Sequence, residues 1–293
     1  MALSRRYANI GLVAFIDLLG YSARVEAIQT ADDLKKIERD VRNVQAWFDY
    51  KSGDEAIRDV QKLQSKRILA FSDCLVIAVP SFSELTRSEG DFDVQLAELV
   101  AFAYAQGRSV VNGIFLRGGI DYGLWYKRSD TIISPAMITA YHLEQSAIVP
   151  MIAISDALMA HFRKHPHRKF YSKGDDPFRR YFKRLALPDG RKQWMLDYLP
   201  LFLGEIDGVL TRDERERYRD ADNQERERMR ATAHLRDLRS MTLAHKEQIV
   251  TARSATTSLR IRAKYDWLAE YHDDAVRRFY RRPPPETLIG DSR

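Results

Sequence analysis

The first half of the chain alternates between short apolar runs and segments whose apolar residues recur every three or four positions. Short apolar runs predict buried strands, and the three- to four-residue repeat predicts amphipathic helices. Thr30 and Asp33 have the spacing of a capping box near the start of the first long helix. The predicted elements are a strand at 9–17, a tight turn at 19–22, a helix at about 30–48, a hairpin of strands at 66–70 and 74–79 with its bend at 71–73, a polar loop at 81–93, a helix at 94–111, a strand at 114–122, a polar loop at 127–130, a helix at 135–146 and a strand at 149–154. This order is typical of an α+β sandwich of the split βαβ type.

The composition changes after about residue 156. Residues 156–182 are rich in His, Arg, Lys and aromatic residues, and one more strand is predicted at 193–199. Charges of both signs then alternate over residues 211–239, which predicts a solvated helix or helix pair, and a further helix is expected at 245–282. Three consecutive prolines end that helix, and a disordered tail is expected after it. The predicted division is therefore a core at 1–155, an elaboration of it at 156–205, a charged helical extension at 206–282 and a disordered tail at 283–293.

Composition and charge narrow the function classes only mildly. Apolar residues make up 45% of the 293 positions, which is enough for a sizeable core. The net charge of +6 favours an anionic partner such as a triphosphate, a nucleic acid or a lipid surface, although 47 basic residues face 41 acidic ones. The single cysteine, Cys74, lies in an apolar run and is expected to pack as a small hydrophobic residue in a reducing compartment. No signal peptide or long apolar span is evident, so a cytoplasmic protein without a membrane partner is expected.

One candidate for chemistry is the end of the first predicted strand. Asp17 closes the apolar run, and Gly20, Tyr21 and Ser22 follow in a turn that leads to a helix. A carboxylate in such a place can bind a hard cation, and N–H groups at a helix start can bind phosphate oxygens. The alternative is a helix-capping Asp with a Gly that serves only the turn.

A second candidate is Asp73, at the bend between two apolar strands. Taken alone, an Asp there is ordinary turn chemistry. Asp17 and Asp73, however, flank an amphipathic helix at two strand ends, and that layout is typical of palm-type sites that bind two divalent ions. The pair therefore favours a two-metal phosphoryl-transfer site.

Four segments carry a resemblance to a known family, over about residues 7–155. Phe15 to Ser22 (FIDLLGYS) resembles the first catalytic motif of class III nucleotidyl cyclases, and Asp73 falls where that family has its second metal carboxylate. The segment Arg117-Gly118-Gly119-Ile120 with Gly123 is similar to the family's R-x-G-I…G strand, and Pro135 to Glu144 (PAMITAYHLE) is similar to its following helix. The helical extension, with FSD and AYHLEQS, most resembles the bacterial Pycsar pyrimidine (uridylate or cytidylate) cyclases of antiphage defence.

The resemblance implies a fold, an activity and a set of partners. The fold would be the ferredoxin-like, palm-type cyclase sandwich, and the activity would be conversion of UTP to 3′,5′-cyclic UMP and diphosphate. Two Mn²⁺ or Mg²⁺ ions would be held by Asp17, Asp73 and the main-chain carbonyl of Leu18. Gly20, Tyr21 and Ser22 would bind the β- and γ-phosphates. The chain would form a homodimer with its sites at the interface, and a separate effector protein would read the product.

Departures from the family pattern bear on the base and on the transition state. Leu69 stands where purine cyclases have a polar base selector, so a pyrimidine is expected in a pocket beside Leu69 and Phe71. The family's transition-state Asn and Arg align with Ile138 and His142. Their roles would pass to His142, to Arg117 as a catalytic residue, or to Lys127 and Arg128 as triphosphate ligands, although each can also be an ordinary surface residue.

Alternative functions remain open at the sequence level. CTP would fit the same pocket and yield cyclic CMP. The missing Asn favours a cyclase fold without turnover that senses a nucleotide or a phage component. A diguanylate or oligonucleotide-synthesising palm enzyme would need a Gly-Gly-Asp/Glu hairpin, which is absent at Asp73. Nucleic acid is not expected as the main ligand, because acidic residues interrupt the Arg-rich stretch at 212–239.

Overall fold

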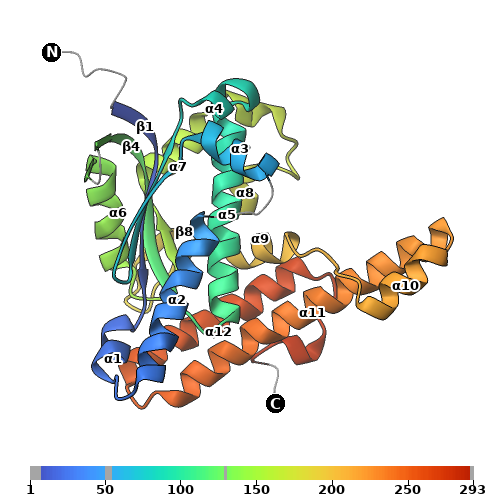
Figure 1. The fold of residues 1–293 in the computed structure, drawn as a ribbon. Coiled ribbons are helices and arrows are strands. Elements are labelled where there is room, and N and C mark those ends of the chain that lie inside the picture. The colour runs from blue at the N-terminus through green and yellow to red at the C-terminus, as the bar shows by residue number, and fades with distance from the viewer. Residues whose placement is uncertain (1–7, 50–54, 129–130, 291–293) are drawn as a thin grey trace. The chain divides into compact units, whose positions relative to one another are not determined.

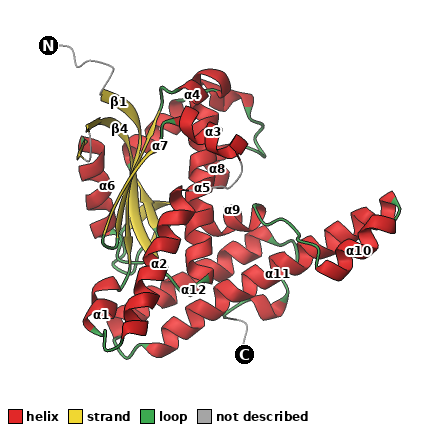
Figure 2. Cartoon of the chain, viewed as in Figure 1, coloured by secondary structure: helices red, strands yellow, loops and turns green. Residues whose placement is uncertain are grey.

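An eight-stranded sheet, yellow in Figure 2, organises the first part of the chain in the computed structural model, which describes residues 8–49, 55–128 and 131–290. Its strand order is β2-β3-β1-β4-β6-β8-β7, and β5 pairs with β4 beside that path. Only β4 and β6 are parallel among the paired strands described. The strands are β1 (Ala8–Leu18), β2 (Arg67–Phe71), β3 (Cys74–Pro80), β4 (Leu116–Arg128), β5 (Thr131–Ile133), β6 (Ile152–Ile154), β7 (Phe182–Ala186) and β8 (Lys192–Leu196).

Helices cover both faces of this sheet. Figure 1 shows α6 on one face and α2 and α5 on the other. Glycine lets α6 approach β4 closely, because a Cβ atom added at Gly119 would lie 2.2 Å from the Ala140 carbonyl oxygen. Helices in this part are α1 (Tyr21–Glu26), α2 (Ala31–Asp49), α3 (Glu55–Gln64), α4 (Glu84–Glu89), α5 (Asp91–Val111), α6 (Pro135–Ser146), α7 (Asp156–Lys164), η1 (Pro166–Phe170) and α8 (Pro177–Tyr181).

The chain divides into two compact units. The first comprises residues 1–109 and 114–198, and the second comprises residues 110–113 and 199–293. The mixed sheet confirms the predicted α+β class. Strands β7 and β8, within the segment 156–205 that was expected to elaborate the core, continue the sheet as far as Leu196.

Local signals in the sequence located several elements well. The capping box at the start of α2 is confirmed, since the Asp33 N–H donates to Thr30 Oγ1 and the Thr30 N–H donates to Asp33 Oδ2. Helix α6 has the predicted bounds, with Pro135 at its first turn and the Ser134 hydroxyl accepting from the Met137 N–H.

The loop predicted at 81–93 is wrong, and the loop predicted at 127–130 is wrong for its first two residues. Residues 81–93 contain α4 and the start of α5, because Ser83 and Thr86 form a reciprocal cap that begins a short helix within a polar stretch. The loop expected at 127–130 begins inside β4, which continues to Arg128, and β5 begins at Thr131. The residues between them lie outside the described part of the chain.

The second unit contains α9 (Tyr198–Gly204), α10 (Arg212–Asp220), α11 (Asn223–Ala255), α12 (Leu259–Phe279) and η2 (Pro285–Thr287). The break between its long helices falls at residues 256–258, rather than between the expected segments at 211–239 and 245–282. Helices α11 and α12 run antiparallel, joined by a 2.9 Å contact between the Nδ1 atoms of the buried His245 and His272.

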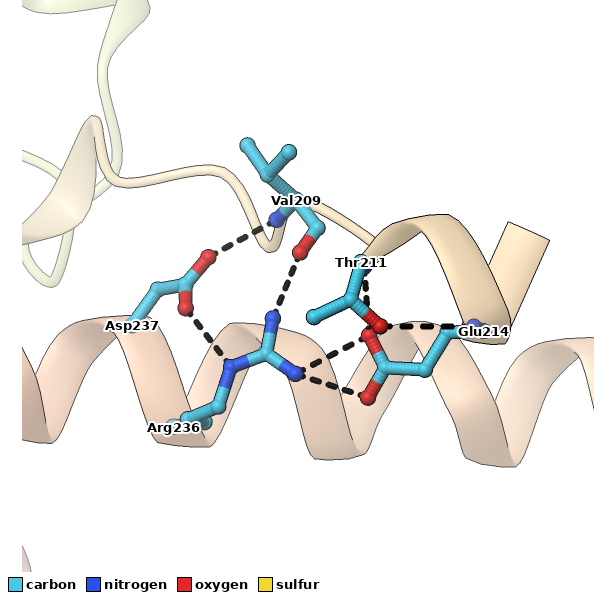
Figure 3. A network of polar contacts seen from close by, with 5 residues as sticks. All are labelled: Val209, Thr211, Glu214, Arg236 and Asp237. Carbon is cyan, nitrogen blue, oxygen red and sulfur yellow. Dashed lines mark hydrogen bonds and ion pairs between the residues drawn. The ribbon is translucent and has the colours of Figure 1, made fainter.

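A polar network fixes the segment that leads into α10 (Figure 3). Arg236 of α11 donates to both carboxylate oxygens of Glu214, at 2.7 and 3.0 Å, and to the Val209 carbonyl. Asp237 accepts from the Val209 N–H at 2.8 Å. Both termini of the 209–214 segment are thus held against one turn of α11.

The tail expected to be disordered is instead packed on its own unit, so that prediction is wrong for residues 283–290. His272 Nε2 donates to the Thr287 carbonyl at 2.8 Å, and Asp273 accepts from the N–H groups of Ile289 and Gly290 at 2.7 and 2.8 Å. Thr287 and Leu288 are buried. The three prolines end the helix as expected, but side chains of α12 then satisfy the backbone groups that follow. Residues 291–293 lie outside the described part of the chain.

Candidate active site

Asp17 lies near the end of β1, at the centre of a row of side chains that crosses the sheet. Antiparallel register pairs Asp17 with Cys74 of β3 on one side and with Arg117 of β4 on the other. Directly paired residues project from the same face of a sheet, so these three side chains share a face. The pairing of Phe71 with Cys74 extends the row onto β2.

Asp73 lies in the turn between β2 and β3, beside this row. The preceding Ser72 has a positive φ of 55°, which makes the turn tight, and the Leu18 N–H donates to the Asp73 carbonyl at 3.3 Å. This bond holds the turn against the end of β1. Ligand atoms of Asp17, Asp73 and Cys74 consequently lie within 4.8 Å of one another. The structure thus brings together the two carboxylates that the sequence singled out.

Cys74 completes this cluster as a neutral thiol. Its Sγ lies 3.6 Å from Asp17 Oδ1 and 3.8 Å from Asp73 Oδ1. Burial, together with the neighbouring carboxylates, raises the pKa of Cys74 to about 12. The thiol therefore stays protonated at neutral pH and faces carboxylates, in contrast to the expected packing as a small hydrophobic residue.

The ionised form of the Asp17 side chain is electrostatically unfavourable without a bound cation. Burial raises its pKa from the ordinary 3.8 to about 6; Glu144 and Asp73 add to the shift, and Arg117 opposes it. A divalent cation between the two carboxylates would relieve both the burial cost and the repulsion. Two carboxylates in contact are also the oxygen donors that Mg²⁺ and Mn²⁺ prefer. The residues present therefore fit a hard divalent ion.

Arg117 connects Asp17 to a second buried carboxylate. Its Nη2 lies 3.3 Å from Asp17 Oδ2 and forms a shorter ion pair with Glu144 Oε1. Glu144 comes from α6, is 1% exposed, and its Oε2 accepts from Gln145 Nε2 at 2.6 Å. Burial raises the pKa of Glu144, and the Arg117 guanidinium counteracts the shift.

Glu144 was not predicted as a site residue, although it ends the helix segment that resembles the cyclase family. Ala136, Ala140 and Glu144 are spaced by four and form the buried face of α6. A carboxylate on an otherwise small, apolar helix face was the available signal, because a buried charge requires a partner.

The glycine turn follows β1 directly. Gly20 has a φ of 80°, and α1 starts at the next residue, Tyr21. A Cβ atom at Gly20 would meet nothing within 4 Å, so the positive φ alone requires glycine in this chain. Gly20, Tyr21 and Ser22 therefore lie just beyond the strand end that carries Asp17.

Leu69 and Phe71 lie on the face of the sheet that carries Asp17. Leu69 pairs with Val76, which pairs with Phe15, two residues before Asp17. Phe71 is 55% exposed. Tyr141 of α6 approaches Phe15 edge-on, with ring centroids 5.3 Å apart, and is 42% exposed. An open, largely apolar surface thus adjoins the carboxylates.

Two predicted site residues are not brought to Asp17 of the same chain. His142 is exposed and lies half a turn from the buried face of α6. Lys127 lies at the other end of β4, beyond the pairing of Ala8 with Tyr126. It lines a surface cavity of about 640 Å³ with Arg42 and Arg67. The side chain of Arg128 lies outside the described part of the chain.

Among the residues that the structure describes, no helix is long and apolar enough to span a bilayer.

Comparisons with known proteins yield distant structural likenesses. No family model matches the chain, and no curated protein matches it. An adenylyl cyclase from P. aeruginosa is similar with a TM-score of 0.43 and 13% identity, over 71% of this chain and 97% of that one. A bacterial light-regulated adenylyl cyclase gives 0.39 and 11%, over 67% and 95%. A guanylyl cyclase domain from the fungus Blastocladiella emersonii gives 0.41 and 12%, over 65% and 95%.

Proposed function

We propose that the chain is a nucleotidyl cyclase that converts UTP to 3′,5′-cyclic UMP and diphosphate. The observation that carries the proposal is the pair of strand-end carboxylates, Asp17 and Asp73, whose oxygens lie within 4.8 Å of each other and of Cys74 Sγ. A raised Asp17 pKa and the fit of the donor set to a hard cation support a metal-dependent reaction on a phosphate ester.

In the proposed reaction the ribose 3′-oxygen attacks the α-phosphorus, loses its proton, and diphosphate leaves. Two divalent ions, when bound, supply the Lewis acidity that favours the 3′-alkoxide and the leaving phosphates. Asp17, Asp73 and the Leu18 carbonyl are the ligands we assign to them. N–H groups of Gly20, Tyr21 and Ser22 would donate hydrogen bonds to phosphate oxygens at the start of α1. Arg117 adds a fixed positive charge beside Asp17.

The base would lie over the apolar surface that adjoins Asp17. If the phosphates bind at Gly20 to Ser22, the nucleoside would extend in the opposite direction, over the row of Leu69, Val76 and Phe15. Leu69 offers no hydrogen bond to a purine edge, and each unpaired polar group costs about 1–3 kcal/mol on desolvation, or about 5- to 150-fold in discrimination. We therefore expect UTP turnover to exceed ATP and GTP turnover at least about tenfold. Exclusive use of CTP would change only the choice between pyrimidines.

A homodimer is part of this proposal. Phe71, Tyr141 and Ile138 are large, exposed side chains near the Asp17 face, with Ile138 56% exposed. A second copy would cover them and would bring polar groups, such as the exposed His142, to a site that lacks the Asn–Arg pair of the resembled family. A role in antiphage signalling, with a separate effector reading the product, would follow from the resemblance to Pycsar cyclases.

A catalytically inactive nucleotide sensor is the second candidate. Ile138 favours it, since this side chain cannot hydrogen-bond where the resembled family has an Asn. Both candidates predict nucleotide binding, but only an enzyme yields product.

The test is incubation with each of the four triphosphates and Mn²⁺, followed by mass spectrometry. Asp17→Ala and Asp73→Ala serve as variants that must lose the product while retaining a thermal transition. Nucleotide binding without product would favour the sensor. Cyclisation of ATP as fast as that of UTP, or faster, would overturn the pyrimidine assignment, and full activity in either variant would overturn the metal site.

A further inference from the structure

We infer that Glu144 is a positioning residue that competes with Asp17 for the Arg117 guanidinium and so keeps the Asp17 carboxylate available to a divalent cation. This inference deepens the proposed function and rests on its metal site. It assigns a role to a side chain outside the set of expected ligands.

The geometry places one nitrogen between two carboxylates. Arg117 Nη2 forms a close ion pair with Glu144 Oε1, whereas its distance to Asp17 Oδ2 is 3.3 Å. The 3.3 Å contact is at the long end for a charge-assisted hydrogen bond, which is ordinarily 2.7–2.9 Å. The two carboxylates therefore share Arg117: Glu144 Oε1 has the closer ion pair, and Asp17 Oδ2 accepts a long hydrogen bond from the same nitrogen.

Because these side chains are largely buried, the loss of either carboxylate would change how Arg117 is paired. Glu144 is 1% exposed, and the side chains of Arg117 and Asp17 are 19% and 17% exposed. A guanidinium left without Glu144 in such a place would pair with the nearest carboxylate, because a buried charge without a partner is costly. Asp17 is that carboxylate, since it already lies beside Arg117 in the β1–β4 register.

The backbone fixes where each charge can go. Gly119, two residues after Arg117, lets α6 approach until the Ala140 carbonyl occupies the place of a side chain. One turn further along α6, Glu144 reaches Arg117, and Gln145 Nε2 donates to its second oxygen at 2.6 Å. Both Glu144 oxygens are therefore engaged, and the carboxylate has a fixed position from which to hold the guanidinium.

The experiment measures binding of Mn²⁺ alone, by electron paramagnetic resonance of the free ion, to the full chain without nucleotide. Asp17→Asn defines the signal that depends on this site. Glu144→Gln is expected to weaken site-dependent Mn²⁺ binding at least about tenfold, the scale of one hydrogen bond to a charged group. Combining Glu144→Gln with Arg117→Gln is expected to return the affinity to within about threefold of wild type, because the competing guanidinium is gone.

Glu98→Gln is the matched control. Glu98 is also a buried carboxylate on a helix, ion-paired with Lys66, and neither residue belongs to the Asp17 cluster. Its loss should lower the thermal transition as a structural pair does, and leave Mn²⁺ affinity unchanged.

Three results would overturn the inference: wild-type affinity in Glu144→Gln, a double variant as weak as Glu144→Gln, or an equal loss in Glu98→Gln. Absence of Asp17-dependent Mn²⁺ binding in the wild-type chain would overturn it together with the metal site. Mn²⁺ binding with the expected variant pattern but no cyclic product would uphold the inference and reject the cyclase activity.

Discussion

Replacing Asp17 by the uncharged isostere asparagine should stabilise the metal-free protein at neutral pH. Burial and the neighbouring Glu144 and Asp73 raise the pKa of Asp17 from 3.8 to about 6, despite the opposing Arg117. A carboxyl group whose pKa is raised on folding binds its proton more tightly in the folded state. Its ionisation therefore opposes folding, and the stability it contributes at low pH is lost as the pH rises from about 4 through about 6.

The magnitude follows from the shift. Each pKa unit corresponds to about 1.4 kcal/mol, so the ionised Asp17 costs up to about 3 kcal/mol above pH 7. Its side chain is 17% exposed, and solvent screening lowers the cost below this upper value. For a unit of about 200 residues, 1 kcal/mol shifts the melting temperature by about 2–4 °C, so the increase is at most roughly 6–12 °C.

The assay is thermal unfolding of wild type and Asp17→Asn in chelator, at pH 4 and pH 7.5, and again with Mn²⁺. The variant should melt higher at pH 7.5, the difference should shrink at pH 4, and Mn²⁺ should stabilise only the wild type. Asp176→Asn is a control of opposite sign, because its hydrogen bonds with Arg168 lower the pKa of Asp176. An Asp17→Asn variant that is no more stable at pH 7.5, or whose advantage does not depend on pH, would refute the account.

Two further predictions concern packing and the second unit. Gly119→Ala should shift α6 against β4, lower the free energy of unfolding by about 1–3 kcal/mol and reduce cyclisation. Gly174→Ala is the control and should change neither property, because the nearest atom to an added Cβ is 3.7 Å away. Chemical denaturation and product formation measure the two effects. Arg236→Ala should release residues 205–211 from α11 and accelerate their cleavage by thermolysin. Arg212→Ala is the control and should leave the cleavage rate unchanged, because Arg212 is largely exposed. Equal cleavage rates in the wild type and both variants would contradict the structural role of Arg236.

Local sequence signals were sufficient where a short stretch of chain decides its own structure. The Thr30–Asp33 box and the Pro135 helix start depend on contacts within one turn, so the bounds of α2 and α6 followed closely. The Ser83–Thr86 cap is equally local, yet α4 was missed because serine and threonine are also typical of loops. The strands β7 and β8 are short and pair mainly with each other, and only β8 was predicted.

The candidate site divides in the same way. Carboxylates at two strand ends could be recognised from the pattern of apolar runs, because a strand end places its side chain at the edge of a sheet. That Asp17, Asp73 and Cys74 lie within 4.8 Å depends on register across three strands, which the sequence did not define. The position of Lys127 was likewise decided by the sheet, since Lys127 lies ten residues past Arg117 on β4, near the far end of that strand.

By itself the sequence determined the mixed α+β character of this protein, its charged helical second half and the pairing of Asp17 with Asp73 as a candidate metal site. Only the tertiary structure decided that Glu144 holds Arg117, that Cys74 faces carboxylates, and that residues 283–290 pack against α11 and α12. Periodicity and capping arise from interactions between residues a few positions apart, so they can be recognised from the sequence alone. A buried charge and its counter-ion can lie far apart in the chain, as Arg117 and Glu144 do, and only packing selects the partner.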